Sequence, residues 1–136
     1  MSRAKLYQIL QTDAASAVSG ALGAIGLKRE NIYLTGIDSP HGEVFLIIKF
    51  GEMTRGMGPV NRSNVTVWAY DKDRDYQRID QMLKRIRVLF EAVEATQTDT
   101  GWITTIRWTG DSEDLFDDVY RASARNSAYQ MTDSGR

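Results

Sequence analysis

Apolar residues repeat with a helical period in two parts of the chain. Between residues 3 and 24 they recur at three- and four-residue steps, which predicts one amphipathic helix with Gly26 as its C-terminal cap. The small side chains of residues 14–26 would let another backbone segment approach closely. Residues 75–96 carry the clearer stripe, and the acidic residues within 71–75 favour a helix N-terminus there. The stripe of this second helix consists of Tyr76, Ile79, Met82, Leu83, Ile86, Leu89, Phe90 and Val93.

Five other segments have the continuous or alternating apolar pattern of β-strands: residues 31–38, 43–50, 64–70, 102–109 and 121–131. The run EVFLIIKF over 43–50 is too continuous for a strand with one wet face, so we expect it at the centre of the sheet. Small and larger side chains alternate over 121–131, which indicates pairing with the preceding strand. Between those two strands, residues 110–118 form an acidic turn, and residues 132–136 are expected to be frayed.

The segment GEMTRGMGPVNRS, residues 51–63, has no hydrophobic period and contains three Gly and one Pro. It predicts an unusually long connection between two hairpin strands, since such loops commonly take two to five residues. Its glycines lack the Gly-Lys-Ser/Thr ending of a phosphate-binding loop. A flexible loop is therefore the favoured interpretation.

The order of these elements predicts one α+β domain over residues 1–136. We expect a mainly antiparallel β-sheet packed on one face by two α-helices. A length of 136 residues suits a single domain that buries a core without covalent crosslinks.

The amino-acid composition limits the kinds of functional site that the chain can form. The chain has no Cys and a single His, His41, which leaves no thiolate site and makes a zinc site or a His-based catalytic triad improbable. We therefore expect no cofactor, no metal and no enzymatic activity. No apolar stretch approaches the roughly 20 residues that span a bilayer, so we expect no membrane association.

Charge is balanced overall, with 17 basic and 18 acidic residues, but it is segregated along the chain. Basic side chains occupy the polar face of the second helix: Arg74, Arg78, Lys84, Arg85 and Arg87. Acidic ones gather in the turn before the last strand: Asp111, Glu113, Asp114, Asp117 and Asp118. The acidic spacing does not match a calcium loop, which favours a solvated turn.

Two separate patches of opposite charge are the two halves of a head-to-tail contact between copies, which closes into a ring when the rotation permits. The predicted subunit interface therefore joins two sets of residues: Arg78, Lys84, Arg85 and Arg87 on one side, and Asp111, Glu113, Asp114, Asp117 and Asp118 on the other. The same basic face, with outward aromatics such as Trp68 or Trp108, leaves a nucleic-acid-binding module as an alternative.

The run VTVWAYDKDRDYQRIDQMLKRIRVLFEAV, within residues 64–93, resembles the tail terminator, or tail completion, proteins of long-tailed bacteriophages, especially those that infect actinobacteria. The resemblance lies in a strand that ends in aromatic-Asp, a short charged turn, Tyr-x-x-Ile-Asp and an amphipathic helix. The chain length, the N-terminal helix and the ending GWITTIRWTGDSEDLFDDVYRASARNSAYQM agree with that family in layout.

The resemblance implies a structural virion protein at the junction of tail and neck, assembled in the host cytoplasm. Such a protein forms a hexameric ring that caps the tail tube, ends tail polymerisation and offers the surface on which the head connector docks. Its partners are further copies of itself, the major tail tube protein and a neck or stopper protein, and DNA passes through its channel without sequence-specific binding. Other neck or head-tail connector proteins are similar in size and stay open as an alternative.

We expect the loop 51–63 to become ordered on contact with the tail tube or a neighbouring subunit, because a long Gly-rich loop keeps its freedom until something binds it. The residues predicted to make that contact are Met53, Arg55, Met57 and Arg62.

Overall fold

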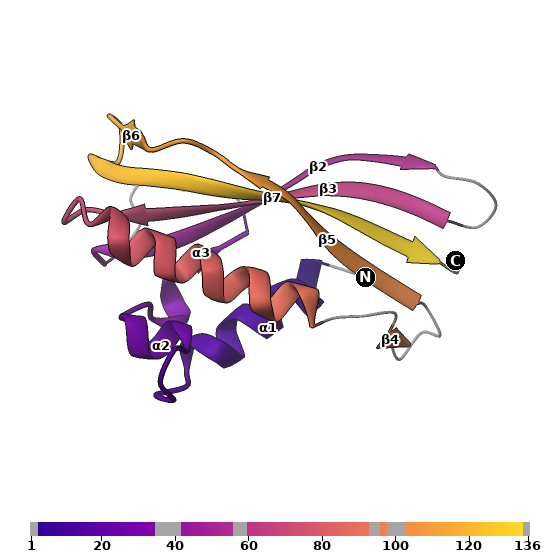
Figure 1. Cartoon of the computed structure of the whole chain (residues 1–136), viewed down its shortest axis with the longest axis horizontal. Coiled ribbons are helices and arrows are strands. Elements are labelled where there is room, and N and C mark those ends of the chain that lie inside the picture. Colours follow the sequence, from indigo (N-terminus) through magenta and orange to yellow (C-terminus); the bar gives the residue numbers. More distant parts are fainter. Residues whose placement is uncertain (1–2, 35–41, 56–59, 93–95, 98–102, 135–136) are drawn as a thin grey trace.

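The computed structural model describes residues 3–34, 42–55, 60–92, 96–97 and 103–134, and it has the α+β architecture predicted from the sequence (Figure 1). His41 lies outside the described residues. The elements in chain order are α1 (Arg3–Ala14), α2 (Leu22–Ile25), a 3-10 helix η1 (Arg29–Asn31), β1 (Ile32–Tyr33), β2 (Val44–Arg55), β3 (Val60–Asp71), α3 (Tyr76–Glu91), β4 (Thr96–Gln97), β5 (Ile103–Asp111), β6 (Leu115–Asp117) and β7 (Ala122–Ser134).

The strands form one sheet in the order β1-β2-β3-β7-β5-β4, and β6 pairs with β7 beside this path. Every pairing among the described residues is antiparallel except the short parallel pair of β1 with β2. All three α-helices lie on the same side of the sheet (Figure 1). α3 contacts β3, β5 and β7, whereas α1 contacts α3 and β1. The predicted antiparallel sheet with helices on one face is therefore confirmed.

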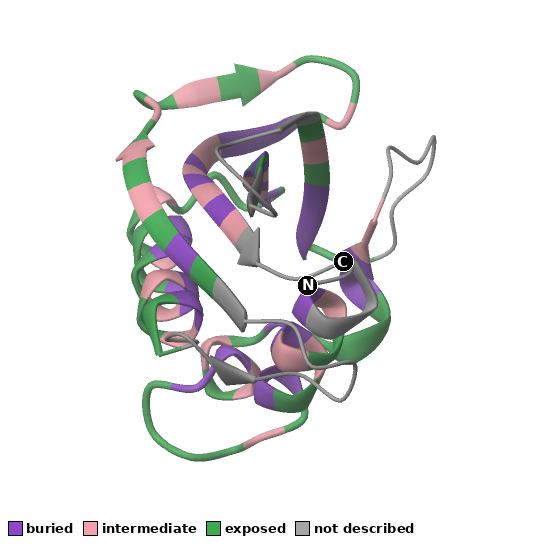
Figure 2. Cartoon of the chain, turned by 90° about the vertical axis from the view of Figure 1, so that its right-hand side faces the viewer, coloured by how far each residue is buried: buried purple, intermediate pink, exposed green. Residues whose placement is uncertain are grey.

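The main core lies between the sheet and the helices. Figure 2 shows α3 buried on its inner side and exposed on its outer side, and it shows β5 alternating between exposed and buried or half-buried positions. Leu6 and Leu10 of α1, Ile79 and Ile86 of α3, and Val67 of β3 are all buried in this cluster. Each buried side chain of this size contributes roughly 1.5 to 3 kcal/mol relative to exposure, so this layer is the principal source of stability.

A smaller core covers the opposite face at one end of the sheet. Phe45 of β2 stacks on Tyr70 of β3 at a centroid distance of 4.6 Å, and Tyr120 meets both rings edge-on. β2 is thus buried on both faces although it lies next to the edge strand β1, while β3 and β7 are central. The prediction that residues 43–50 form the central strand was wrong, because burial from two sides produces the same apolar run as a central position.

The first predicted helix is interrupted. α1 ends at Ala14, and the chain turns before α2 begins at Leu22. The amide of Leu22 donates to the Asp13 carboxylate at 2.9 Å, which fixes the turn. A Cβ on Gly23 would lie 2.2 Å from the Ser16 carbonyl oxygen, so the small residues of this stretch do permit a close backbone approach, between neighbouring segments of the same turn. Gly26, at φ 116°, caps α2 as predicted for the end of this region.

The segment 51–63 is mostly hairpin and not the predicted long loop. β2 continues to Arg55 and β3 begins at Val60, with Arg55 opposite Asn61 and a register shift between Phe50 and Met53. β3 is also paired with β7 along this stretch. β3 is hydrogen-bonded to β2 on one side and to β7 on the other. This backbone pairing outweighs the weak strand propensity of the segment 51–63.

The C-terminal segment is also more ordered than predicted. Thr132 pairs with Arg62 on one side and with Thr105 on the other, and β7 continues to Ser134, so residues 132–134 are not frayed. This order cannot be predicted from the polar residues 132–134 themselves, because the hydrogen bonds that stabilise it come from the backbones of the neighbouring strands β3 and β5.

α3 begins where its sequence predicts and ends earlier. Asp75 is its N-cap and accepts from the Arg78 amide at 3.2 Å, but the helix stops at Glu91. The acidic turn 110–118 contains a short strand, β6, whose Phe116 lies opposite Ser123. No helix within the described ranges is long and apolar enough to cross a bilayer.

Candidate functional site: the charged face of the α3 helix

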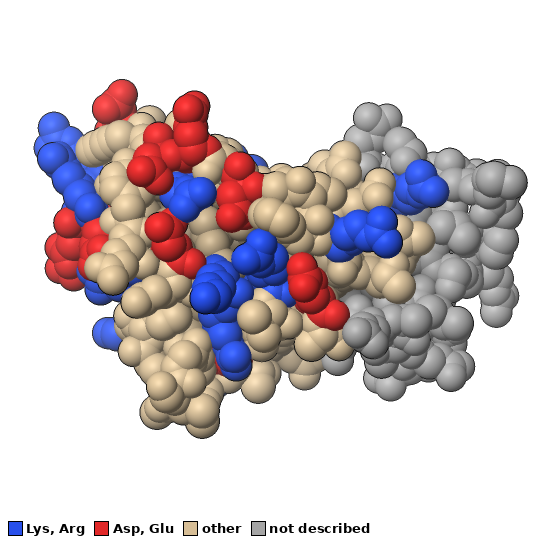
Figure 3. All heavy atoms as spheres, viewed as in Figure 1, with Lys and Arg blue, Asp and Glu red and all other residues tan. Residues whose placement is uncertain are grey.

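The basic helix face and the acidic turn, predicted to be separate patches, meet on one face of the molecule. Figure 3 shows Lys and Arg beside Asp and Glu over α3 and over the end of the sheet that carries β6. Lys84 and Arg87 of α3 line one shallow hollow together with Asp111 of the acidic turn. The segregation along the sequence is therefore largely removed by folding, because β5 and β7 pack against α3.

Arg78 is held by two carboxylates of the β3–α3 turn. Its Nε donates to Asp71 at 2.7 Å, and its Nη2 donates to Asp71 at 3.3 Å and to Asp73 at 3.1 Å. Asp71 is fully buried, and its Oδ1 also accepts from the Asp73 amide at 2.8 Å. Arg78 thereby fixes the turn that sets the direction of α3. Its positive charge is neutralised by carboxylates of the same chain.

Arg85 binds α1 to α3. Its Nε and Nη2 donate to the two Asp13 oxygens at 2.9 and 2.7 Å, a bidentate pair. Burial by itself raises the pKa of Asp13, but the Arg85 guanidinium and the Leu22 amide outweigh it and hold that pKa below its usual value. The predicted interface residues Arg78 and Arg85 therefore both have structural partners inside the subunit.

The Asp13–Arg85 pair predicts a pH-dependent stability. An acid whose pKa is lowered in the folded state stabilises it above its unfolded pKa, near 3.8, and this contribution is lost as pH falls through the folded pKa. We expect Asp13→Asn to lower the free energy of unfolding by about 2 kcal/mol at neutral pH, since it removes charge-assisted hydrogen bonds. The deficit relative to the unmodified protein should shrink at acidic pH, as measured by urea unfolding across the pH range.

Asp118→Asn is the matched control for this titration, because Asp118 is exposed and accepts no hydrogen bond from another described residue. Its free energy of unfolding should stay within about 0.5 kcal/mol of the unmodified protein at every pH. A deficit for Asp13→Asn that stays constant down to acid pH would contradict the ionic role of Asp13.

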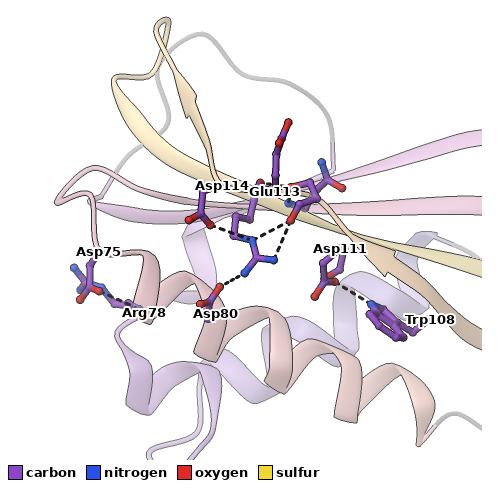
Figure 4. Close-up of polar contacts among 11 residues, drawn as sticks. Asp75, Arg78, Asp80, Trp108, Asp111, Glu113 and Asp114 are labelled. Atoms are coloured by element: carbon purple, nitrogen blue, oxygen red, sulfur yellow. Dashed lines mark hydrogen bonds and ion pairs between the residues drawn. The ribbon is translucent and has the colours of Figure 1, made fainter.

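Arg87 joins α3 to β5. Its guanidinium carbon lies 4.3 Å from the ring centre of Trp108, a cation–π contact. The Trp108 indole donates to the Asp111 carboxylate at 2.9 Å (Figure 4), and the Ser127 hydroxyl donates to the same carboxylate oxygen. Asp111, predicted as an interface acid, thus orients the aromatic ring on which Arg87 rests.

The organising residue of the acidic turn is Arg125, which was not predicted from the sequence. Its guanidinium donates to the Ser112 carbonyl oxygen at 3.1 and 2.9 Å and pairs with Asp80 of α3, and its Nε lies 3.5 Å from Asp114 (Figure 4). The alternation of side chains along β7 does contain a signal for Arg125. Residues 123, 125 and 127 share one face of the strand, and the long Arg125 side chain lies there between the small, buried Ser123 and Ser127. Arg125 anchors the turn to the helix.

The remaining predicted interface residues are exposed or bound only locally. Lys84 and Glu113 are exposed, as is Asp118, and Asp117 accepts from the Tyr120 amide at 2.9 Å. No ion pair joins Lys84 or Asp118 to another residue in the described part of the chain. These side chains are the part of the predicted interface that stays available to another molecule.

The predicted contact loop lies partly within the β2–β3 hairpin. Arg62 is exposed on β3, opposite Thr54 and Thr132, and the backbones of Met53 and Arg55 belong to β2. Met57 lies outside the described residues.

The chemistry of this face suits surface recognition. Arg78, Arg85 and Arg125 are paired with carboxylates and Arg87 is stacked on an aromatic ring, which leaves fewer cations for phosphate than the sequence suggests. The described residues contain no group of three or more His, Cys, Asp or Glu side chains placed to hold a metal ion. Comparison of the sequence with known protein families finds no matching family model, and comparison with curated proteins finds no significant match.

Proposed function

We propose that this protein is a structural component of a long-tailed bacteriophage: a tail terminator that forms a hexameric ring on the tail tube, ends tube polymerisation and presents the surface for head joining. The observation that carries the proposal is the resemblance of residues 64–93 to that family. Its partners are further copies of the chain, the tail tube protein and a neck or stopper protein, with DNA passing through the channel. Its place is the tail-neck junction of the virion.

The structural role of those residues supports the proposal. They form one continuous unit of strand, turn and helix in which the fully buried Asp71 binds Arg78, and β3 is paired on both sides. The aromatic-Asp ending and the charged turn are thus the residues that fix the angle between sheet and helix. The motif that carries the resemblance therefore has a structural role in this chain beyond that of an amphipathic helix.

The β2–β3 hairpin supplies a second supporting feature. Its strands extend past the helices at one end of the molecule (Figure 1), with Arg62 exposed on it. A strand-paired arm binds with less ordering cost than a free loop, since its backbone is already fixed. We therefore assign tube or neighbour contact to a preformed arm, in place of a loop that orders on binding.

The test uses the full-length protein and the major tail tube protein of the same phage. We expect rings of six copies, about 92 kDa from a chain mass of 15.3 kDa, and tubes that stop growing at the end the rings occupy. Negative-stain imaging and tube-length distributions with and without the protein give the readout. Tubes of unchanged length, with no rings at either end, would contradict the proposal.

Arg62→Glu separates tube contact from ring formation, because Arg62 lies on the hairpin and away from α3. If the arm meets the tube, this variant still forms rings but caps tubes less efficiently. Arg29→Glu is the matched control: it makes the same charge reversal at an exposed residue of η1, outside the hairpin. Equal capping by both variants would remove the hairpin from the tube interface.

A further inference from the structure

Two of the exposed large apolar side chains in the described residues are almost adjacent. Phe116 of β6 is 42% exposed, and Val119, in the turn between β6 and β7, is 82% exposed. Asp117 and Asp118 lie between them. We call residues 116–119 the knob. Exposed apolar groups rimmed by charge are typical of protein contact sites.

The knob is held in place by the β3–α3 region. The Tyr76 hydroxyl donates to the Leu115 carbonyl oxygen at 2.6 Å, and the Arg74 guanidinium carbon lies 4.9 Å from the Phe116 ring centre. The Tyr120 amide closes the turn on Asp117 at 2.9 Å. Because these contacts already order the knob, a partner does not have to immobilise it on binding.

A hollow of matching character lies on the flank of α3. It has a volume of about 160 Å³ and is lined by Asp80, Leu83, Lys84, Arg87, Asp111 and Arg125. Small-molecule pockets commonly have about 300 to 1,000 Å³, so this hollow suits a single protruding side chain better than a cofactor or nucleotide. Arg125 is paired with Asp80 and Asp114, so the excess positive charge of the hollow lies at Lys84 and Arg87, next to Asp111.

We propose that the knob of one copy docks into the hollow of the next, with Phe116 entering the hollow and Asp117 and Asp118 toward Lys84 and Arg87. The occupant is a second copy because the chain itself carries both complementary surfaces, an acidic apolar projection and a hollow with the cation Lys84 and the ring-stacked Arg87 on its rim. The contact is heterologous, so each copy offers one free knob and one free hollow, and repeated contacts form a ring when the rotation between copies closes. This inference rests on the proposed ring function and specifies its subunit interface.

The first experiment removes the apolar part of the knob. We expect Phe116→Ser with Val119→Ser to weaken self-association at least about tenfold by sedimentation equilibrium. Val18→Ser is the matched control, since Val18 is an equally apolar side chain, 69% exposed and far from the knob in sequence. The control should associate like the unmodified protein. Thermal unfolding by circular dichroism verifies that both variants are folded.

The second experiment exploits the heterologous geometry. Lys84→Glu should block the hollow and leave the knob intact. At a concentration where the weakened self-association leaves either variant alone monomeric, their mixture retains one good knob and one good hollow and should stop at a mixed dimer of about 31 kDa, twice the chain mass. A mixture that stays monomeric, or that assembles fully, would overturn the proposed pairing.

The outcomes separate this inference from the proposed function. Rings that persist in the knob variant overturn the knob–hollow contact and leave the tail-terminator proposal standing. Self-association that depends on the knob but never caps tail tubes supports the contact and overturns the function. A protein that remains monomeric at millimolar concentration overturns the knob–hollow contact directly.

Discussion

Replacing Asp71 by Ala is expected to lower the free energy of unfolding by about 3 kcal/mol. Asp71 is fully buried and accepts hydrogen bonds from Arg78 and from the Asp73 amide. Removing one member of a buried ion pair costs about 3 to 5 kcal/mol because the other charge loses its partner. The lower end applies here, since the Arg78 side chain is 24% exposed and water compensates part of the loss.

Urea unfolding measures this effect, with Asp73→Ala as the control. Asp73 binds the same Arg78 side chain at 3.1 Å but is exposed, so its removal should cost less than about 1 kcal/mol. Because α3 and the knob both depend on this turn, we also expect Asp71→Ala to abolish ring assembly. Equal losses from the two substitutions would mean that burial of Asp71 contributes nothing beyond a surface ion pair.

Replacing Phe90 by Ala is expected to cost about 3 to 5 kcal/mol of unfolding free energy, the usual range for deleting a buried aromatic ring. Phe90 is fully buried near the end of α3 and meets Tyr129 of the central strand β7 edge-on, at a centroid distance of 5.0 Å. The ring closes the layer between helix and sheet where α3 ends. A cavity there has few ways to collapse, because β7 is paired on both sides.

Val88→Ala is the control on the same helix, since Val88 is exposed and its truncation should change the free energy of unfolding by no more than about 0.5 kcal/mol. Chemical denaturation of both variants with a common slope gives the comparison. A Phe90→Ala deficit below about 1 kcal/mol would contradict the assignment of Phe90 to the structural core.

The sequence was most informative where side-chain chemistry determines the structure. The stripe from Tyr76 to Phe90 and the Asp75 cap predicted α3, since both signals lie within the helix itself. The ends of β2 and β3 could not be predicted, because the order of residues 51–55 and 60–63 comes from neighbouring backbones that any polar sequence can pair with. Local patterns carry no information about such partners.

The candidate site, too, could be predicted only where the signal lies in neighbouring residues of the sequence. The charged residues of α3 and of the acidic turn were recognised, but the sequence could not show that Arg85 reaches Asp13, 72 residues away. Among the described residues, Lys84 and Asp118 have no ion pair, so they are the predicted interface residues that remain available to another copy. Arg125 was not predicted because its signal, a long cation that alternates in register with the small Ser123 and Ser127, can be read only once that face of β7 is known to be buried.

The position of β7 in the sheet has a consequence for biosynthesis. β7 is the last of the described strands along the chain, yet it lies between β3 and β5 and also pairs with β6. Until the ribosome has synthesised it, β5 and β6 lack their main partner and one edge of β3 is open. Unpaired strand edges favour intermolecular pairing. The nascent chain is therefore most prone to aggregate just before β7 emerges, and β7 completes the sheet and protects these edges in one step.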